Sequence, residues 1–462
     1  MGRNHPALTL ELGCYMEQII ITGRKRLSGD VHINGAKNAA VAIIPAAIAA
    51  KGISQIENLP CIEDVNILTN AIRSIGVKCE FADPHTLIID STDISGFKIT
   101  YDFARNMRAS YYLLGALLGR FGQAIVPMPG GCNFGSRPID QHIKGFEALG
   151  AKIVIQHGLI HATAERLTGS NIYLDIASVG ATINIMLAAV YAEGVTTIEN
   201  AAREPHVVDT ANFLNMLGAN IKGAGTDIIR IIGVSELHGA EYQIIPDYIE
   251  AGTFMIASAI TGGDVKVCNV IPKHMDSLSA KLIEMNCRLK EGGDYIRVIG
   301  TDRLQAANIK TMVYPGFPTD LQPQMTALLS TARGTSVVTE TVFDNRFQYM
   351  TELRRLGCNV TVEGRVAVVE GGVTLSGAEV SATDLRAGAA LVIGGLAAKG
   401  ETTISNVKYI DRGYEDIENK LRMLGADIRR VNAAKNAESE PGVSFIINPG
   451  LSGVQPAGRL GL

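Results

Sequence analysis

The sequence lacks an excess of charge of either sign, and it lacks a long apolar run. Its 42 lysines and arginines against 46 aspartates and glutamates give a formal net charge of -4 over 462 residues. Such a balance provides no overall field for nucleic acid or an anionic membrane, so any anion site has to be built locally. The longest apolar stretch, 39–50, contains Pro45 and is shorter than the roughly 20 residues that cross a bilayer. We expect a cytoplasmic protein with no nucleic-acid or membrane partner.

The sequence also lacks the common signatures of metal and nucleotide sites. Its seven cysteines form no C-x-x-C pair, and its nine histidines show no ligand spacing. There is no G-x-x-x-x-G-K-[ST] loop, no G-x-G-x-x-G turn, no H-E-x-x-H and no G-x-S-x-G elbow. We therefore expect reduced thiols, no metal and no cofactor.

A repeat is present instead. Six apolar segments recur along the chain, at 39–50, 107–119, 181–192, 251–260, 324–331 and 387–398. Each is followed by a β-rich run and an amphipathic segment, which ends in a turn at Gly76, Gly150, Gly218, Asn286, Gly357 or Gly425. Glycine is expected there because a left-handed residue often ends a helix. The pattern predicts six α/β units with buried apolar helices and amphipathic outer helices. A solenoid is the structural alternative.

Charged or hydrogen-bonding residues stand at the starts of the apolar segments. They are Lys37, Asn38, Arg108, Ser178, Val179, Gly180, Glu250, Thr319, Asp320, Asp384 and Arg386. Capping explains Ser178, Asp320 and Asp384, and Thr319 fits a capping box with the glutamine three residues later. It does not explain Lys37, Arg108 or Arg386, because a cation at a helix start opposes the helix dipole. A bound anion would resolve this conflict.

Cys132 differs from the other cysteines in its surroundings. It lies in the segment 129–138, which holds three glycines and two prolines and leads into Arg137. We expect a shaped loop that can close over a ligand. A thiol near an arginine would have a depressed pKa and be reactive, whereas five or six of the seven cysteines are expected to be small core residues. Arg412 occupies the place in another repeat that Arg137 occupies here. We therefore favour a cluster of cations that binds a polyanion over the alternative that these arginines are simply solvated.

Six motifs stand in order along the chain, at 35–40, 129–138, 178–182, 314–320, 384–387 and 411–415. Together they resemble the UDP-N-acetylglucosamine 1-carboxyvinyltransferase family, the enolpyruvyl transferases that open peptidoglycan synthesis. The resemblance runs from about Met16 to about Arg430. It implies a two-lobed inside-out α/β barrel built from six repeats of about 70 residues, three per lobe. One lobe would comprise 37–245 and the other 1–36 with 246–430, and 431–462 would be a flexible tail.

The resemblance also implies a reaction. The enolpyruvyl group of phosphoenolpyruvate would pass to the 3'-hydroxyl of UDP-N-acetylglucosamine through a tetrahedral phospho-ketal, with release of phosphate. Cys132 would act as the acid or in product release and Asp320 as the base, together with Lys37 and Arg412. The implied phosphoenolpyruvate-binding residues are Lys37, Asn38, Arg108, Arg137, Arg386 and Arg412. The implied UDP-N-acetylglucosamine-binding residues are Asn38, Arg108, Arg137, Pro138, Ile139, Asp140, Gln141, Ser178, Val179, Gly180, Asp320, Val342 and Phe343.

Two positions depart from the family pattern. Ile176 stands where lysine is frequent, and Tyr248 stands where arginine is frequent, so both changes remove positive charge. Two alternatives remain beside the main hypothesis: a sister enzyme that uses shikimate phosphate, and an inactive paralogue that binds a UDP-sugar. The motif expected near the start of the first is absent, and retention of the four catalytic candidates argues against the second. The motifs do not specify an oligomeric state.

Overall fold

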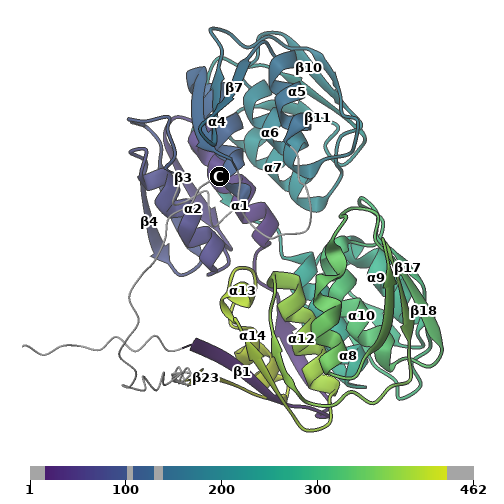
Figure 1. The fold of residues 1–462 in the computed structure, drawn as a ribbon. Coiled ribbons are helices and arrows are strands. Elements are labelled where there is room, and N and C mark those ends of the chain that lie inside the picture. The colour runs from purple at the N-terminus through teal and green to yellow at the C-terminus, as the bar shows by residue number, and fades with distance from the viewer. Residues whose placement is uncertain (1–15, 101–107, 129–138, 434–462) are drawn as a thin grey trace, which may run out of the picture. The chain divides into compact units, whose positions relative to one another are not determined.

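Helices and strands alternate along residues 16–100, 108–128 and 139–433, which are the residues that this computed structural model describes (Figure 1). Their strands form six sheets, five of four strands and one of three. The three-stranded sheet is antiparallel, and the other five are mixed. In one of these, β10 (Val195–Glu199) pairs parallel with β9 (Asn171–Tyr173) and antiparallel with β12 (Ile228–Ile232). The protein thus has an α/β fold.

Three of the sheets are formed by the part of the chain between 53 and 243. Their orders are β13-β3-β5-β4 (Glu241–Gln243, Ile53–Glu57, Thr86–Asp90, Lys78–Asp83), β6-β8-β7 (Gln123–Pro127, Leu159–Thr163, Lys152–Gln156) and β11-β12-β10-β9, with β11 at Asn220–Lys222.

The other three sheets combine strands from both ends of the described chain. Their orders are β15-β16-β14-β2 (Arg288–Glu291, Tyr295–Ile299, Asp264–Cys268, Ser28–His32), β17-β18-β20-β19 (Ile309–Lys310, Thr335–Thr339, Val366–Glu370, Asn359–Glu363) and β21-β22-β1-β23 (Glu379–Ser381, Glu401–Ser405, Met16–Thr22, Asp427–Ala433). In the last of these, β1, the first strand of the described chain, lies between β22 and β23, the last two.

The six apolar segments are helices. They are α1 (Lys37–Ala49), α4 (Tyr112–Phe121), α6 (Val179–Ala189), α8 (Tyr248–Ile260), α10 (Gln322–Thr331) and α12 (Leu385–Ala397). Side chains are buried all around them, as in α1 from Ala39 to Ala49, so these helices pack against apolar neighbours on every side. α8, α10 and α12 lie side by side in Figure 1, and α1 and α6 both contact α4.

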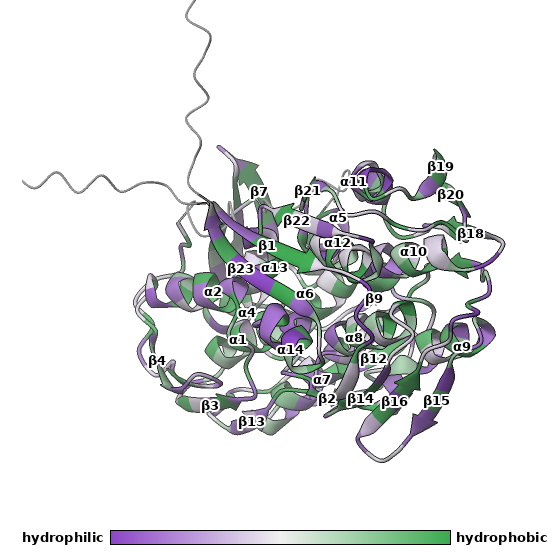
Figure 2. Ribbon diagram, turned by 90° about the horizontal axis from the view of Figure 1, so that it is seen from below, coloured by the Kyte–Doolittle hydropathy of each residue, from purple (hydrophilic) through white to green (hydrophobic). Residues whose placement is uncertain are grey.

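The amphipathic segments form a second set of helices. They are α2 (Glu63–Arg73), α5 (Asp140–Ala148), α7 (Pro205–Met216), α9 (Asp276–Glu284), α11 (Met350–Arg355) and α14 (Ile417–Met423). Hydrophilic residues are visible on α9 and α14 in Figure 2. The turn residues Gly76, Gly150, Gly218, Asn286, Gly357 and Gly425 all have positive φ, between 72° and 105°. The prediction of left-handed turns at these positions is therefore confirmed, including the one asparagine.

Several helix starts differ in detail from the sequence-based expectation. α4 follows a 3-10 turn, η1 (Arg108–Tyr111), and α10 follows another, η3 (Thr319–Leu321). α8 begins two residues before Glu250, because the Asp247 carboxylate accepts hydrogen bonds from the amides of Ile249 and Glu250 at 2.8 and 3.2 Å. α1 continues through Pro45, since its buried packing offsets the hydrogen bond that proline removes.

Buried apolar side chains form two clusters. The first takes its members from Ala36 to Ile244. The second combines Ile19 to Ile33 with Ile249 to Ile428. The chain passes between the clusters at two adjacent segments, where the Ala36 amide donates to the Ile245 carbonyl and the Asp247 amide to that of Asn34, both at 2.8 Å. The described residues between 17 and 431 form one compact unit, and none of their helices has the length and apolar character needed to span a membrane.

Candidate active site

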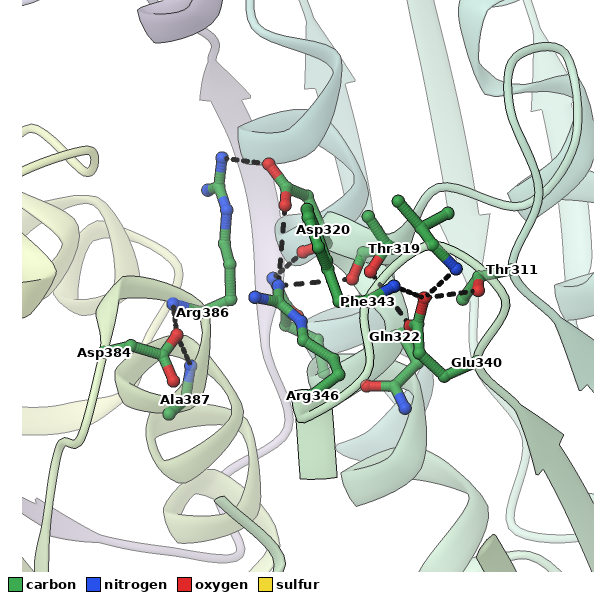
Figure 3. A network of polar contacts seen from close by, with 12 residues as sticks. Thr311, Thr319, Asp320, Gln322, Glu340, Phe343, Arg346, Asp384, Arg386 and Ala387 are labelled. Atoms are coloured by element: carbon green, nitrogen blue, oxygen red, sulfur yellow. Dashed lines mark hydrogen bonds and ion pairs between the residues drawn. The ribbon is translucent and has the colours of Figure 1, made fainter. Parts of the chain in front are cut away.

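Asp320 lies at the start of α10 between two arginines (Figure 3). Arg386 Nη2 donates to Asp320 Oδ2 at 3.1 Å, and Arg346 Nη2 lies 3.5 Å from Oδ1. The arginine side chains are only 4% and 2% exposed, whereas Asp320 is 29% exposed. The carboxylate therefore faces the accessible side of an otherwise buried cluster. Arg346 comes from η4 (Arg346–Tyr349), just before α11.

The two arginines determine the charge of Asp320. Burial alone would raise the pKa of this carboxyl, but Arg386, Arg346 and Lys37 outweigh burial and lower its pKa. Asp320 is consequently ionised at neutral pH. The same pairing raises the pKa of Arg386 in spite of its burial, which by itself would lower it.

The start of α12 shows how a buried helix tolerates a cation in its first turn. Asp384 Oδ1 accepts hydrogen bonds from the amides of Arg386 and Ala387 at 2.9 and 3.0 Å, so Asp384 is the helix cap. The Arg386 guanidinium lies over the Tyr414 ring, with 5.5 Å between its carbon and the ring centre. Asp384, Asp320 and this ring compensate the positive charge that capping alone could not explain.

Lys37 and Arg412 share a second buried carboxylate, that of Asp64. Arg412 Nε donates to Asp64 Oδ1 at 2.8 Å, and Lys37 Nζ lies 3.1 Å from Oδ2. Asp64 is in the first turn of α2 and is 2% exposed. Burial raises its pKa, and the two cations lower it by more, so the pKa lies below the ordinary value. Lys37 is the first residue of α1, and half-buried Asn38 follows it.

The loop with Val342 and Phe343 is organised by Glu340, which is 1% exposed. Glu340 Oε1 accepts hydrogen bonds from the Thr311 hydroxyl and the Val342 amide, both at 2.8 Å, and from the Phe343 amide at 3.2 Å. Its Oε2 accepts from the Thr319 hydroxyl at 2.9 Å (Figure 3). The loop and the turn before Asp320 are thus joined through one carboxylate.

This arrangement corrects one sequence-based expectation. Thr319 does not form a capping box with Gln322, because its hydroxyl is bonded to Glu340. The Gln322 side chain is also engaged elsewhere, since its Oε1 accepts a hydrogen bond from the Tyr349 hydroxyl at 2.9 Å. A tertiary contact has replaced the local one.

The helices α5 and α6 pack on each other, and their first turns lie close together, since a Cβ at position 180 would lie 3.1 Å from His142 Cε1. Ile139, Asp140 and Gln141 open α5, where Gln141 Nε2 donates to the Asp140 carboxylate at 2.9 Å. The opening residues of α6 are Ser178, Val179 and Gly180. Ser178 is the cap, and its hydroxyl accepts from the Ala181 amide at 3.3 Å. A Cβ at position 180 would lie 2.5 Å from the Tyr111 hydroxyl, so a larger residue there would have to displace the Tyr111 side chain.

Other predicted site residues fall outside the described part of the chain. Cys132, Arg137 and Pro138 lie in 129–138, and the side chain of Arg108 is also outside the description, although its backbone begins η1. Within the described ranges, no group of three histidine, cysteine or acidic residues is arranged to hold a metal ion.

His206 and Glu204, near Asp320, have shifted pKa values that the sequence did not indicate. Burial lowers the pKa of His206 to about 4, with Asp320 opposing this shift and Lys37 adding to it. Glu204 accepts a hydrogen bond from the Tyr314 amide at 3.3 Å, and burial raises the pKa of its carboxyl. His206 is consequently neutral at pH 7.

Sequence reasoning also missed Asp64, Glu340 and Arg346. The last two flank the candidate pair Val342 and Phe343, and that proximity was the available signal for them. Asp64 carried no signal, because an acidic residue in the first turn of an amphipathic helix is ordinary and only packing buries it.

Comparison with known proteins identifies the family of the chain. The family model described as EPSP synthase (3-phosphoshikimate 1-carboxyvinyltransferase) matches residues 21–421. UDP-N-acetylglucosamine 1-carboxyvinyltransferase 2 of Clostridium acetobutylicum is 56% identical over 90% of this chain and 99% of its own length. The enzyme of the same name from Bacillus subtilis is 54% identical over 90% of this chain and 97% of its own.

Solved structures show the same relationship. The enolpyruvyl transferase NikO from Streptomyces tendae has a TM-score of 0.82 and 28% identity, covering 91% of this chain and all of its own. EPSP synthase from Acinetobacter baumannii, with a TM-score of 0.70 and 21% identity over 90% of this chain and all of its own, shares the fold. The resemblance inferred from the six motifs is confirmed. The chain belongs to the EPSP synthase (3-phosphoshikimate 1-carboxyvinyltransferase) family.

Proposed function

We propose that the protein transfers the enolpyruvyl group of phosphoenolpyruvate to the 3'-hydroxyl of UDP-N-acetylglucosamine and releases phosphate, as a step of peptidoglycan precursor synthesis. The observation that carries this proposal is the 54% identity, over 90% of the chain, to a relative named UDP-N-acetylglucosamine 1-carboxyvinyltransferase 2. The NikO structure, an enolpyruvyl transferase, supports the donor half of the reaction.

The architecture that we propose is a two-lobed inside-out α/β barrel of six repeats. The two apolar clusters support a division into 37–245 and 1–36 with 246–430, since their members divide at the two crossing segments. The six left-handed turns support the repeat. β23 extends to Ala433, so the tail proposed at 431–462 would begin after this strand.

Phosphoenolpyruvate carries a phosphate and a carboxylate, which suit a cluster of cations. We assign Lys37, Arg137 and Arg412 to direct contact with these anions, with Arg108 and Arg386 close to them. The pairing of Lys37 and Arg412 with one carboxylate supports this assignment, because it brings cations from α1 and from the turn after α13 (Lys408–Asp411) to one point.

The chemistry requires a proton at the methylene carbon and removal of a proton from the sugar hydroxyl. We assign the first to Cys132, as acid or in product release, and the second to Asp320. The lowered pKa of Asp320 makes its carboxylate available at neutral pH but weakly basic. Loosening of its contact with Arg386 as the sugar binds would restore basicity, since that contact lowers the pKa.

We assign the UDP-sugar to Asn38, to 137–141 and 178–180, and to Val342 and Phe343. The close packing of α5 on α6 supports a common site for the first turns of these helices. A helix start offers free amide groups to a diphosphate. Glu340 supports the assignment of the loop, because it holds Val342 and Phe343 beside the turn that leads to Asp320.

The two departures from the family pattern affect this assignment differently. Ile176 is 62% exposed beside the start of α6, so a nucleotide diphosphate would meet an apolar side chain there. Tyr248 opens α8, and burial, followed by the charges of Asp320 and Glu204, raises its pKa well above the ordinary value. We propose that the first change weakens nucleotide binding and that the second leaves the reaction intact.

The proposal includes a cytoplasmic enzyme without nucleic-acid or membrane partners, cofactor or metal. Free thiols at the described cysteines support a reducing compartment; these are Cys61, Cys79, Cys268, Cys287 and Cys358.

A phosphate-release assay on the full chain tests the function. Phosphate should form from phosphoenolpyruvate with UDP-N-acetylglucosamine and not with shikimate 3-phosphate. Arg412→Gln should abolish turnover, whereas Arg429→Gln, which removes an exposed arginine paired with Glu401, should retain it. Absence of phosphate with both acceptors would refute the enzyme hypothesis, and release with shikimate 3-phosphate alone would assign the acceptor to the sister reaction.

A further inference from the structure

Asp64 occupies a position that an anionic substrate would need. Its carboxylate receives Arg412 Nε at 2.8 Å and Nη2 at 3.4 Å, and Lys37 Nζ lies 3.1 Å away. These are the two cations assigned above to phosphoenolpyruvate. One buried carboxylate thus binds the donor-site lysine and arginine at once, and these cations belong to opposite ends of the chain.

Neighbouring contacts hold this geometry. Gly413 follows Arg412, and a Cβ added there would lie 2.9 Å from Lys37 Cδ and 2.6 Å from Leu385 Cδ2. The lysine stem therefore runs against the backbone beside Arg412. Glu415 ties the same turn to the segment before α2, because its Oε2 accepts the Cys61 amide at 2.9 Å. Asp64 and its cations are fixed from both sides.

The charges favour exchange over simple scaffolding. Two cations share one carboxylate, so the trio carries a net positive charge at a buried point. An anion with two or more charges would interact more strongly with both cations than one carboxylate does. A carboxylate that remained beside such an anion would repel it, and this repulsion is strong where water is excluded.

We propose that Asp64 is an internal competitor for Lys37 and Arg412. It gives up the two cations when the phosphate-bearing donor binds and takes them back as inorganic phosphate leaves. The exchange makes and breaks only ion pairs and hydrogen bonds, so no covalent step or proton transfer is involved. The inference rests on the proposed function, and it makes Asp64 a positioning residue that acts through the two cations.

Asp64→Asn tests this competition because it removes the charge and preserves the shape. With inorganic phosphate as the probe, the thermal midpoint of the variant should rise at a phosphate concentration at least about tenfold lower than that needed by the wild type. In turnover, the KM for phosphoenolpyruvate should fall, and kcat should also fall because phosphate leaves more slowly. Asp302→Asn is the matched control, since it removes an exposed carboxylate paired with Arg26 and should leave both measurements unchanged.

Equal or weaker stabilisation of Asp64→Asn by phosphate would overturn the proposal. Asp64→Glu provides a second measurement if the asparagine variant folds poorly, because it keeps the charge: it should need at least as much phosphate as the wild type, and tighter binding would contradict competition. Failure of the proposed function is distinguishable, since it would appear as absent turnover in the wild type while the difference in phosphate binding persisted.

Discussion

Arg386 and Asp320 are 66 residues apart, and Arg386 Nη2 donates to Asp320 Oδ2 at 3.1 Å. Each stands at the start of a buried helix, so the pair joins α10 to α12 at the candidate site. The cation lowers the pKa of the carboxyl, and the carboxylate provides the charge that the arginine needs in order to be buried.

Asp320→Asn should remove both functions of this pair. We expect phosphate release to fall at least about 100-fold, because the candidate base is lost. The free energy of unfolding should fall by about 2 kcal/mol, because Arg386 and Arg346 would lose their common carboxylate. Steady-state assays and urea unfolding measure the two effects.

Asp276→Asn is the control for this experiment. It removes a carboxylate from an exposed pair with Lys273, which should cost less than about 1 kcal/mol. Unchanged stability of Asp320→Asn would show that the two arginines do not depend on the carboxylate.

Glu340→Ala should loosen the loop that carries Val342 and Phe343. The alanine leaves the donors of Thr311, Val342 and Phe343 without their acceptor, and we expect a loss of about 3 kcal/mol in the free energy of unfolding. The KM for UDP-N-acetylglucosamine should rise about tenfold or more if the loop binds this substrate.

Glu340→Gln is the conservative counterpart. Its amide oxygen can accept the same three hydrogen bonds, and the Thr319 hydroxyl can turn to accept one from the amide nitrogen. A loss within about 1 kcal/mol is expected. Similar losses in the two variants would mean that the charge of Glu340, and not its hydrogen bonds, holds the loop.

The raised pKa of Asp209 predicts that the stability of the protein depends on pH. Burial raises the pKa of its carboxyl from 3.8 to about 6, although hydrogen bonds from Tyr242 and the Ile245 amide oppose the shift. Between these values the folded state keeps a proton that the unfolded state has lost. The contribution of Asp209 to the free energy of unfolding should therefore decrease as pH rises from 4 to 6, by at most about 3 kcal/mol.

Asp209→Asn should remove this contribution. The free energy of unfolding of the variant, relative to that of the wild type, should therefore increase as pH rises from 4 to 6. Urea unfolding at several pH values measures the difference. Glu204 and Glu250 also have raised pKa values, but both residues are present in the wild type and in the variant, so their contributions cancel in the difference. A constant difference between pH 4 and 6 would show that Asp209 does not titrate there.

Cys132→Asp should retain turnover and lose covalent inactivation by the epoxide fosfomycin. A carboxylic acid can supply a proton, but it is alkylated far less readily than a thiolate. Mass spectrometry of the treated protein and residual activity measure the two properties.

Cys61→Ser is the matched control, because Cys61 is an exposed cysteine in the described part of the chain. Burial and the charge of Glu415 raise the pKa of its thiol, so we expect little reaction there, and inactivation should be as in the wild type. Equal inactivation of Cys132→Asp and the wild type would assign the reaction to another residue.

Local physics made much of the fold predictable from the sequence. A run that is apolar on all faces has to be buried, and α1 and α12 are. A residue that ends a helix in the left-handed region is glycine or asparagine, which located Gly218 and Asn286 correctly. These inferences use only neighbours in the chain.

The partners of the charged groups were decided by tertiary structure. Arg412 and Asp64 are 348 residues apart, and nothing in either segment indicates that they meet. Thr319 and Gln322 fit a local capping box, yet Glu340 and Tyr349 bind their side chains instead. The sequence by itself determined where the buried apolar helices and the left-handed turns lie and which residues are cationic. Only the packing of distant helices decided which carboxylate each cation meets, because a buried charge binds the nearest opposite charge that the fold brings to it.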